Sequence, residues 1–166
     1  VKSRIKLENK ELPEMLRFGM KMRLPKYENV WYYGRGPWEN YSDRNSASFI
    51  GNYKCKVNDL KFDYIRPQEN GYRTDVRFAE FTNDSGQGVR FEAVNMPFCF
   101  NARYNADEDM DPGLTKKQQH PVDVDSRGEL YVNIDYGQKG LGGNNSWGSR
   151  GQKHRRSWQP RSGHRA

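Results

Sequence analysis

Short segments of this chain alternate hydrophobic and polar residues, which is the pattern of β-strands with one buried face. In the clearest segment, one face carries Leu130, Val132, Ile134 and Tyr136, and the other carries Tyr131, Asn133 and Asp135. The same pattern predicts further strands over Lys2–Leu7, Met15–Leu24, Val30–Tyr33, Ser48–Val57, Thr74–Phe81, Gly88–Val94 and Phe98–Tyr104. The alternation slips once in the fourth of these segments, which predicts a bulge near Gly51.

Helix signals are few. Ala106–Met110 is acidic and long enough for one helical turn, for which Asn105 is the expected N-cap. Thr115–Gln119 predicts a second turn, and Asp111-Pro112-Gly113 between the two prevents a longer helix. Asn83-Asp84-Ser85-Gly86 predicts a hairpin turn between two strands. The pattern as a whole predicts an all-β chain.

The composition fits a single domain with a modest core. The chain has 166 residues, of which 34% are hydrophobic and 30% are charged. Aromatic residues make up 13%, which favours β structure and also suits a carbohydrate-binding surface. Val1 is not a start methionine, and the first residues do not form a signal-peptide pattern. We therefore expect the chain to be a piece of a longer protein.

The formal net charge of +7 raises the question of nucleic-acid binding. Residues 149–166 account for most of this excess, because they contain no acid and six basic residues: Arg150, Lys153, Arg155, Arg156, Arg161 and Arg165. A nucleic-acid interface needs basic residues spread over one face of a domain. We therefore expect no nucleic-acid partner, and divide the chain into a domain, 1–148, and a basic, disordered tail, 149–166.

Several other classes of site are not expected. No stretch approaches 18 apolar residues, so no membrane span is expected. Cys55 and Cys99 match no metal-binding spacing and make no disulfide framework. Of the three histidines, His154 and His164 lie in the tail and only His120 lies in the domain. No nucleophile–histidine arrangement and no metal site is therefore predicted.

Two clusters of polar and aromatic residues, Tyr33–Tyr41 and Tyr64–Gly71, have the glycine and proline content of irregular loops. Glu39 and Glu69 within them are conceivable as a glycosidase acid and nucleophile. The simpler interpretation is that each carboxylate pairs with an arginine or accepts bonds from loop amides. We favour this interpretation, in which the loops are held by Arg35, Glu39, Asn40, Arg66, Glu69 and Asn70.

A third cluster, Gly140–Gly148, is rich in glycine and asparagine and carries Trp147 near its end. It is not a phosphate-binding loop, because it lacks the GxGxxG and Lys-Ser/Thr patterns. An aromatic ring on such a loop suits stacking on the apolar face of a pyranose, with nearby amides serving the hydroxyls. Trp147 is equally compatible with a structural role. The residues predicted to contact sugar are Asn144, Asn145, Ser146 and Trp147.

Taken in order, these clusters resemble the C-terminal domain of LacZ-type β-galactosidases of glycoside hydrolase family 2. The matching segments are Leu16–Met20, Tyr33–Tyr41, Arg66–Gly71 and Gly140–Trp147, and the resemblance covers roughly residues 12 to 148. It implies a large antiparallel β-sandwich of the galactose-mutarotase-like kind. It also implies a parent enzyme that hydrolyses terminal β-galactosides such as lactose with retention.

The resemblance further implies how this chain contributes to that enzyme. The family's catalytic glutamates lie on a separate barrel domain, so no catalytic residue is expected here. Mg and Na are expected only in that catalytic domain, and no cofactor is expected in this chain. The family's loop tryptophan lies against bound sugar, and Trp147 matches it. The expected partners are the β-galactoside substrate and the remaining domains of the enzyme.

Three departures from the family pattern bear on these expectations. Asn144 and Asn145 stand where the family has two acids, which puts the anchoring of the loop in doubt. The early strands of the family's sandwich are missing, and the tail replaces a closing apolar strand. Because an incomplete sandwich leaves strand edges unpaired, we expect self-association or pairing with the missing part.

Two further hypotheses stay open at this point. One is a free-standing carbohydrate-binding or assembly module without hydrolase activity. The other, an autonomous mutarotase-like isomerase, is disfavoured because the domain holds a single histidine, His120. For the parent enzyme we expect a bacterial type and a cytoplasmic rather than periplasmic location.

Overall fold

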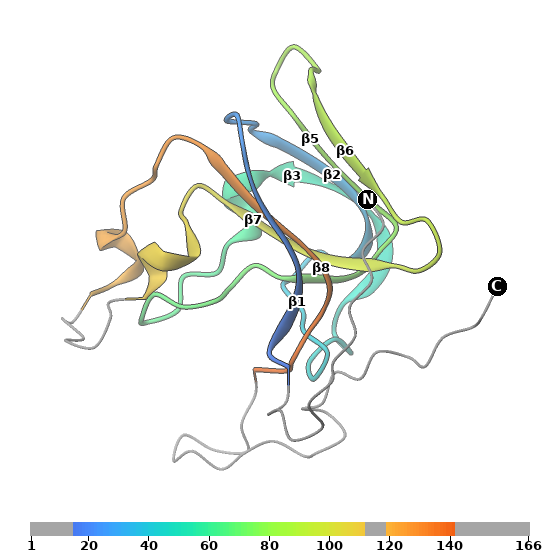
Figure 1. Ribbon diagram of the computed structural model, residues 1–166, viewed down its shortest axis with the longest axis horizontal. Coiled ribbons are helices and arrows are strands. Elements are labelled where there is room, and N and C mark those ends of the chain that lie inside the picture. Colours follow the sequence, from blue (N-terminus) through green and yellow to red (C-terminus); the bar gives the residue numbers. More distant parts are fainter. Residues whose placement is uncertain (1–14, 112–118, 142–166) are drawn as a thin grey trace, which may run out of the picture.

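Two antiparallel four-stranded sheets form the computed structural model, which describes residues 15–111 and 119–141 (Figure 1). The first sheet has the order β1 (Arg17–Leu24), β8 (Leu130–Gln138), β7 (Phe98–Arg103) and β4 (Arg73–Val76). The second has the order β3 (Phe49–Lys56), β2 (Asn29–Gly36), β5 (Phe78–Thr82) and β6 (Gly88–Glu92). Three short 3-10 helices accompany them: η1 (Val57–Leu60), η2 (Asp107–Met110) and η3 (Pro121–Asp123). The predicted all-β sandwich is confirmed.

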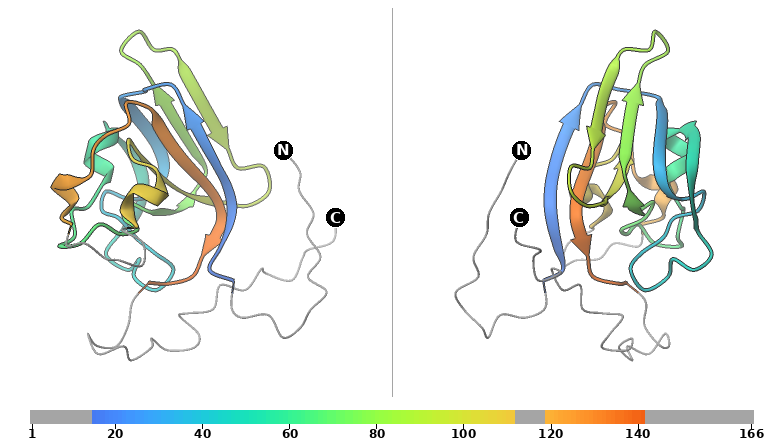
Figure 2. Two further views of the ribbon diagram at one scale, coloured as in Figure 1. Left: turned by 60° about the vertical axis from the view of Figure 1, so that its left-hand side comes forward. Right: turned by 90° about the vertical axis from the view of Figure 1, so that its right-hand side faces the viewer.

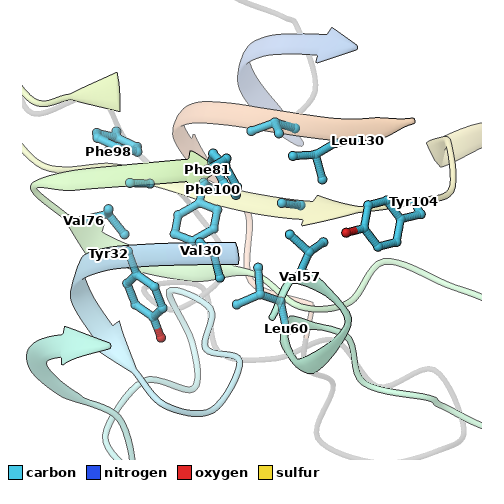
Figure 3. Packing of buried hydrophobic residues seen from close by; sticks show 13 residues of the cluster. Val30, Tyr32, Val57, Leu60, Val76, Phe81, Phe98, Phe100, Tyr104 and Leu130 are labelled. Atoms are coloured by element: carbon cyan, nitrogen blue, oxygen red, sulfur yellow. The ribbon is translucent and has the colours of Figure 1, made fainter. Parts of the chain in front are cut away.

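The core lies between the two sheets, which form the two layers visible in Figure 2. Phe100 of β7 is fully buried and contacts two rings of the opposite sheet edge-on, Tyr32 at 5.4 Å and Phe81 at 5.8 Å between centroids. Val57 and Leu60 of η1 close one end of this core (Figure 3). The alternating residues of the segments predicted as strands therefore supply the core, as binary patterning requires.

Three local predictions are wrong. Thr74–Phe81 is not one strand, because the chain leaves the first sheet after Val76 and enters the second at Phe78. No bulge occurs near Gly51, since β2 and β3 pair in continuous register and Gly51 lies opposite Gly34. The N-cap of η2 is Ala106, one residue later than predicted.

An irregularity in β1 accounts for exposed hydrophobic residues near this strand. The register of β1 against β8 shifts between Phe18 and Gly19. The alternation of β1 therefore does not place its hydrophobic residues on one face, and Leu16 and Met20 are 70% and 43% exposed. β1 and β4 form the edges of the first sheet, and β3 and β6 those of the second. Within the described residues these edges are not covered by a further strand.

The predicted hairpin turn joins β5 and β6. The Asn83 side-chain oxygen accepts hydrogen bonds from the amides of Ser85 and Gln87 at 3.1 and 2.9 Å, and Gly86 has φ +80°. Cys55 and Cys99 are free thiols and half-buried. The predicted strand Lys2–Leu7, most of the turn Thr115–Gln119, and the tail lie outside the described residues.

Candidate functional site

At one end of the first sheet, the loop after β2 lies beside the end of β8, the strand that leads toward the third sequence cluster (Figure 1). The Gly71 amide donates to Glu39 Oε2 at 2.7 Å, which joins the first two clusters. Ser42 directly follows the first cluster, and its Oγ donates to the Gln138 carbonyl at 3.3 Å, which joins the loop after β2 to the strand that leads toward the third cluster. Gly140 lies so close to Asp43 that an added Cβ would come within 2.4 Å of its carboxyl carbon. The end of β8 is therefore packed tightly against the first loop, residues 37–48 between β2 and β3.

Both candidate glutamates are engaged in hydrogen bonds. Glu39 accepts from Arg44 Nη2 at 2.9 Å and from the hydroxyl of Tyr64, in addition to the Gly71 amide. Burial and this carboxylate raise the pKa of Tyr64. Glu69 accepts from Asn101 Nδ2 at 2.6 Å and pairs with Arg17 Nη1 at 3.4 Å. Each carboxylate thus has an arginine neighbour and an amide donor.

Asn40 is completely buried and uses both ends of its amide. Its Nδ2 donates to the carbonyls of Arg35 and Trp38 at 3.2 and 3.0 Å. Its Oδ1 accepts from the amide and the hydroxyl of Thr74 at 3.0 and 2.5 Å. Asn40 therefore links the first loop to β4, and its hydrogen-bonding capacity is filled.

The other residues predicted in these loops have different surroundings. Arg35 lies in β2 and not in a loop, and its Nε donates to Asp75 Oδ2 at 2.5 Å while Nη1 donates to the Ser48 carbonyl at 2.9 Å. Asn70 accepts from the Phe62 amide at 3.2 Å and so closes the second loop. Arg66 is exposed, and its carbonyl accepts a bond from Gln68.

The outer face of the first sheet carries a buried polar network that the sequence pattern did not single out. Asn133 donates to Asn101 at 2.8 Å, and Asn101 in turn donates to Glu69. Asp135 is 2% exposed and accepts from Arg17 Nε at 2.6 Å. Arg103, also buried, donates to Asp107 of η2. Polar residues at alternate positions of β7 and β8 were the only sequence signal for this network.

Burial dominates the electrostatics of this face. It raises the pKa of Asp135 to about 6, although the Arg17 guanidinium acts in the opposite direction. Burial likewise lowers the pKa of Arg103 and raises that of the Cys99 thiol to about 12. Tyr41 and Tyr72 cover the network as a stacked pair, with centroids 5.3 Å apart, and burial raises the pKa of both.

A cleft of about 450 Å³ opens beside this network, between the first loop, β4 and the end of β8. Its lining is Ser42, Asn45, Tyr72, Thr74, Asp75, Arg77, Met96, Pro97, Cys99, Tyr136, Gly137 and Gln138. Asp75 has φ +54°, which is a strained conformation for a residue other than glycine. The cleft lies at the point where the chain leaves β8 toward Gly140.

The described residues contain no group of three or more His, Cys, Asp and Glu side chains placed to hold a metal ion. Within the same part of the chain, no helix has the length and apolarity to cross a membrane. His120 lies in a loop, with Nδ1 3.2 Å from the Ile65 carbonyl. The residues predicted to contact sugar, Asn144, Asn145, Ser146 and Trp147, lie outside the described residues.

Comparison with known proteins decides the family. Residues 1–161 match the family model described as the β-galactosidase small chain. The chain belongs to this family. It is 34% identical over 140 residues to a β-galactosidase of Halalkalibacterium halodurans, covering 83% of this chain and 13% of that protein. Matches of 34% identity to a β-galactosidase of Lactococcus lactis and to BgaC of Bifidobacterium adolescentis each cover 84% of this chain and 13% of the relative.

This member of the small-chain family therefore spans about one eighth of the length of the curated relatives it matches. The matched region includes all three sequence clusters and every strand of the sandwich. The polar network and the cleft described above are thus features of a β-galactosidase small-chain region.

Proposed function

We propose that this chain is the C-terminal, sugar-contacting part of a retaining β-galactosidase that hydrolyses terminal β-galactosides such as lactose. The observation that carries the proposal is that hydrogen bonds join the first two clusters to each other and the loop after β2 to the end of β8, in a chain of the small-chain family. Each anchored contact fixes the point from which the chain enters Gly140–Trp147. A rigid base of this kind is what a loop needs in order to present a ring to substrate.

The catalytic glutamates of that enzyme belong to another domain in this proposal. Glu39 and Glu69 each hold loop or sheet groups through hydrogen bonds of 2.7 and 2.6 Å, which gives each carboxylate a structural role. A glycosidase acid or nucleophile instead faces the scissile bond from the pocket. The metal ions of the enzyme would likewise be held by the missing catalytic domain.

Trp147 is the residue through which this chain would act. Its indole would stack on the apolar face of the sugar, while Asn144, Asn145 and Ser146 would bond to hydroxyls. Such contacts exclude water and orient the substrate for chemistry that is supplied elsewhere. The alternative, a free-standing sugar-binding module, predicts that the chain binds sugar by itself and that no hydrolase activity accompanies the binding.

Kinetics of the assembled enzyme test this role. In the β-galactosidase formed by this chain with its remaining domains, Trp147→Ala is expected to lower kcat/KM for lactose by about tenfold, or about 1.4 kcal/mol. Trp158→Ala is the matched control, because Trp158 lies in the basic tail outside the cluster, and should leave kcat/KM unchanged. If Trp147→Ala stays within about twofold of the parent, the loop has no role in catalysis.

We also propose that the exposed strand edges mediate self-association or pairing with the missing part of the sandwich. β1 is such an edge, and Met20 on it is 43% exposed. Solution scattering of the chain is expected to give a mass above that of a monomer at high concentration. Met20→Lys should lower that mass, whereas Val94→Lys, at an exposed residue outside the strands, should not. A monomer at every concentration would refute self-association and leave only pairing with the missing part.

A further inference from the structure

We propose that the cleft between the first loop, β4 and the end of β8 binds the pyranose ring of a galactoside. This inference deepens the proposed function and rests on it, because it assigns a second sugar contact made by residues other than the Trp147 loop. The cleft has a volume of about 450 Å³, within the range of about 300 to 1,000 Å³ that is usual for small-molecule sites. Its floor belongs to strands and is therefore fixed in shape.

An unsatisfied acceptor marks the cleft as a binding site. Gln138 is 8% exposed, and its Oε1 is buried without a hydrogen-bond partner. Buried polar atoms are nearly always paired, and Gln138 lines the cleft, so the donor that we propose for this oxygen belongs to a molecule that enters the cleft. A sugar hydroxyl is such a donor. The Gln138 carbonyl accepts a hydrogen bond from Ser42, which holds the backbone from which this side chain extends.

A strained residue forms the opposite wall. Asp75 occupies the left-handed region in the stretch where the pairing of β4 with β7 is irregular. Strain of this kind persists only where the surroundings enforce it, and it concentrates at functional sites. Here the Asp75 carboxylate is held by Arg35 Nε, and its carbonyl accepts from Arg77 Nη1. The two arginines therefore fix both ends of Asp75 in place.

The lining combines the groups that a pyranose requires. Hydroxyls act as both donors and acceptors, and the cleft offers amide, carboxylate and guanidinium groups from Asn45, Asp75 and Arg77. Met96, Pro97 and Tyr136 add apolar surface for the C–H face of the ring. This mixture fits an uncharged polyhydroxylated ligand better than an anion, because the Asp75 carboxylate stands beside Arg77, the one cation among the described lining residues.

The cleft also lies close to the loop along the chain. Gln138 precedes Trp147 by nine positions, a span of at most about 30 Å even when fully extended. One substrate with two sugar units could therefore contact both the cleft and the loop. The Gly140 contact with Asp43 fixes where the chain leaves the end of β8.

Titration of the 166-residue chain with methyl β-galactoside, followed by amide and indole NMR shifts, tests the inference. Saturable shifts are expected at Asn45, Thr74, Asp75 and the Gln138 side chain, with a millimolar Kd. Gln138→Met, which keeps the length but removes the amide, should weaken the Kd by about tenfold. Asn45→Ala should weaken it as well. Asn52→Ala, an exposed asparagine of β3 outside the cleft, is the matched control and should leave the Kd unchanged.

The outcomes separate this inference from the role of the loop. Shifts at the cleft that Gln138→Met abolishes and Trp147→Ala leaves intact support the cleft site even if the kinetic test of Trp147 fails. Shifts confined to the Trp147 indole overturn the cleft and leave the proposed function standing. Absence of shifts in a chain whose spectrum shows it to be folded, or shifts reproduced by inorganic phosphate, overturns the inference.

Discussion

Replacing Arg73 with methionine is expected to lower the free energy of unfolding by about 3 kcal/mol. Arg73 is 2% exposed, and in the described part of the chain it has no ion-pair partner. Backbone carbonyls compensate its charge instead. Nη2 donates to Pro37 at 2.8 Å and Nη1 to Gly71 at 3.1 Å. The Tyr32 hydroxyl accepts from Nε at 3.2 Å.

Methionine fills much of the same volume but donates no hydrogen bond. The Gly71 carbonyl would then lose its donor in the interior, at a cost of about 1–3 kcal/mol, and the part-buried hydrogen bond to the Pro37 carbonyl would be lost as well. Because Pro37 belongs to the loop after β2 and Gly71 to the loop before β4, both loops would also lose a common anchor. The fall in stability should therefore be accompanied by looser packing around Glu39, which binds the Gly71 amide.

Urea unfolding followed by circular dichroism measures the change. Arg77→Met is the matched control, because Arg77 lies between β4 and β5, is only half-buried and donates to a single carbonyl, that of Asp75. Its cost should stay below about 1 kcal/mol. If Arg73→Met costs no more than Arg77→Met, the carbonyl network does not hold the loops.

The sequence predicted best those strands whose alternate residues all face the same core. Phe98, Phe100 and Ala102 point into the sandwich from β7, as their spacing indicates. Thr74–Phe81 misled because its two halves belong to different sheets. The buried positions change parity between Val76 and Ala79, but such a slip indicates a bulge as readily as a change of sheet, because the backbone stays extended on both sides.

The candidate site was predictable in its parts and not in its assembly. Tyr33–Tyr41 and Tyr64–Gly71 were identified by their glycine, proline and aromatic content. That Glu39 of the first bonds to Gly71 of the second depends on tertiary contacts that no local pattern encodes. The role of Asp135 was missed for a different reason. An alternating strand is expected to turn its polar residues to solvent, but the polar face of β8 is covered and Asp135 on it is buried.

Asp135 makes the folded chain less stable as the pH rises, whereas most aspartates in folded proteins have the opposite effect. Burial raises its pKa to about 6 from 3.8, so the folded chain holds this proton more tightly than the unfolded chain. Its contribution to the free energy of unfolding is therefore greatest below about pH 4 and falls as the pH rises to about 6. The loss is at most about 3 kcal/mol. Asparagine keeps an acceptor for Arg17 but carries no titrating group.

We therefore expect the parent chain to lose stability relative to Asp135→Asn between about pH 4 and pH 7. The difference between their free energies of unfolding should change by up to about 3 kcal/mol in favour of the variant. Taking this difference removes the contributions of other carboxylates. Asp63→Asn, at an exposed residue paired with Lys61, should give a nearly constant difference over the same range. A flat difference for Asp135→Asn would mean that Arg17 compensates the buried charge fully, whereas the expected slope identifies this aspartate as the costly member of the polar network.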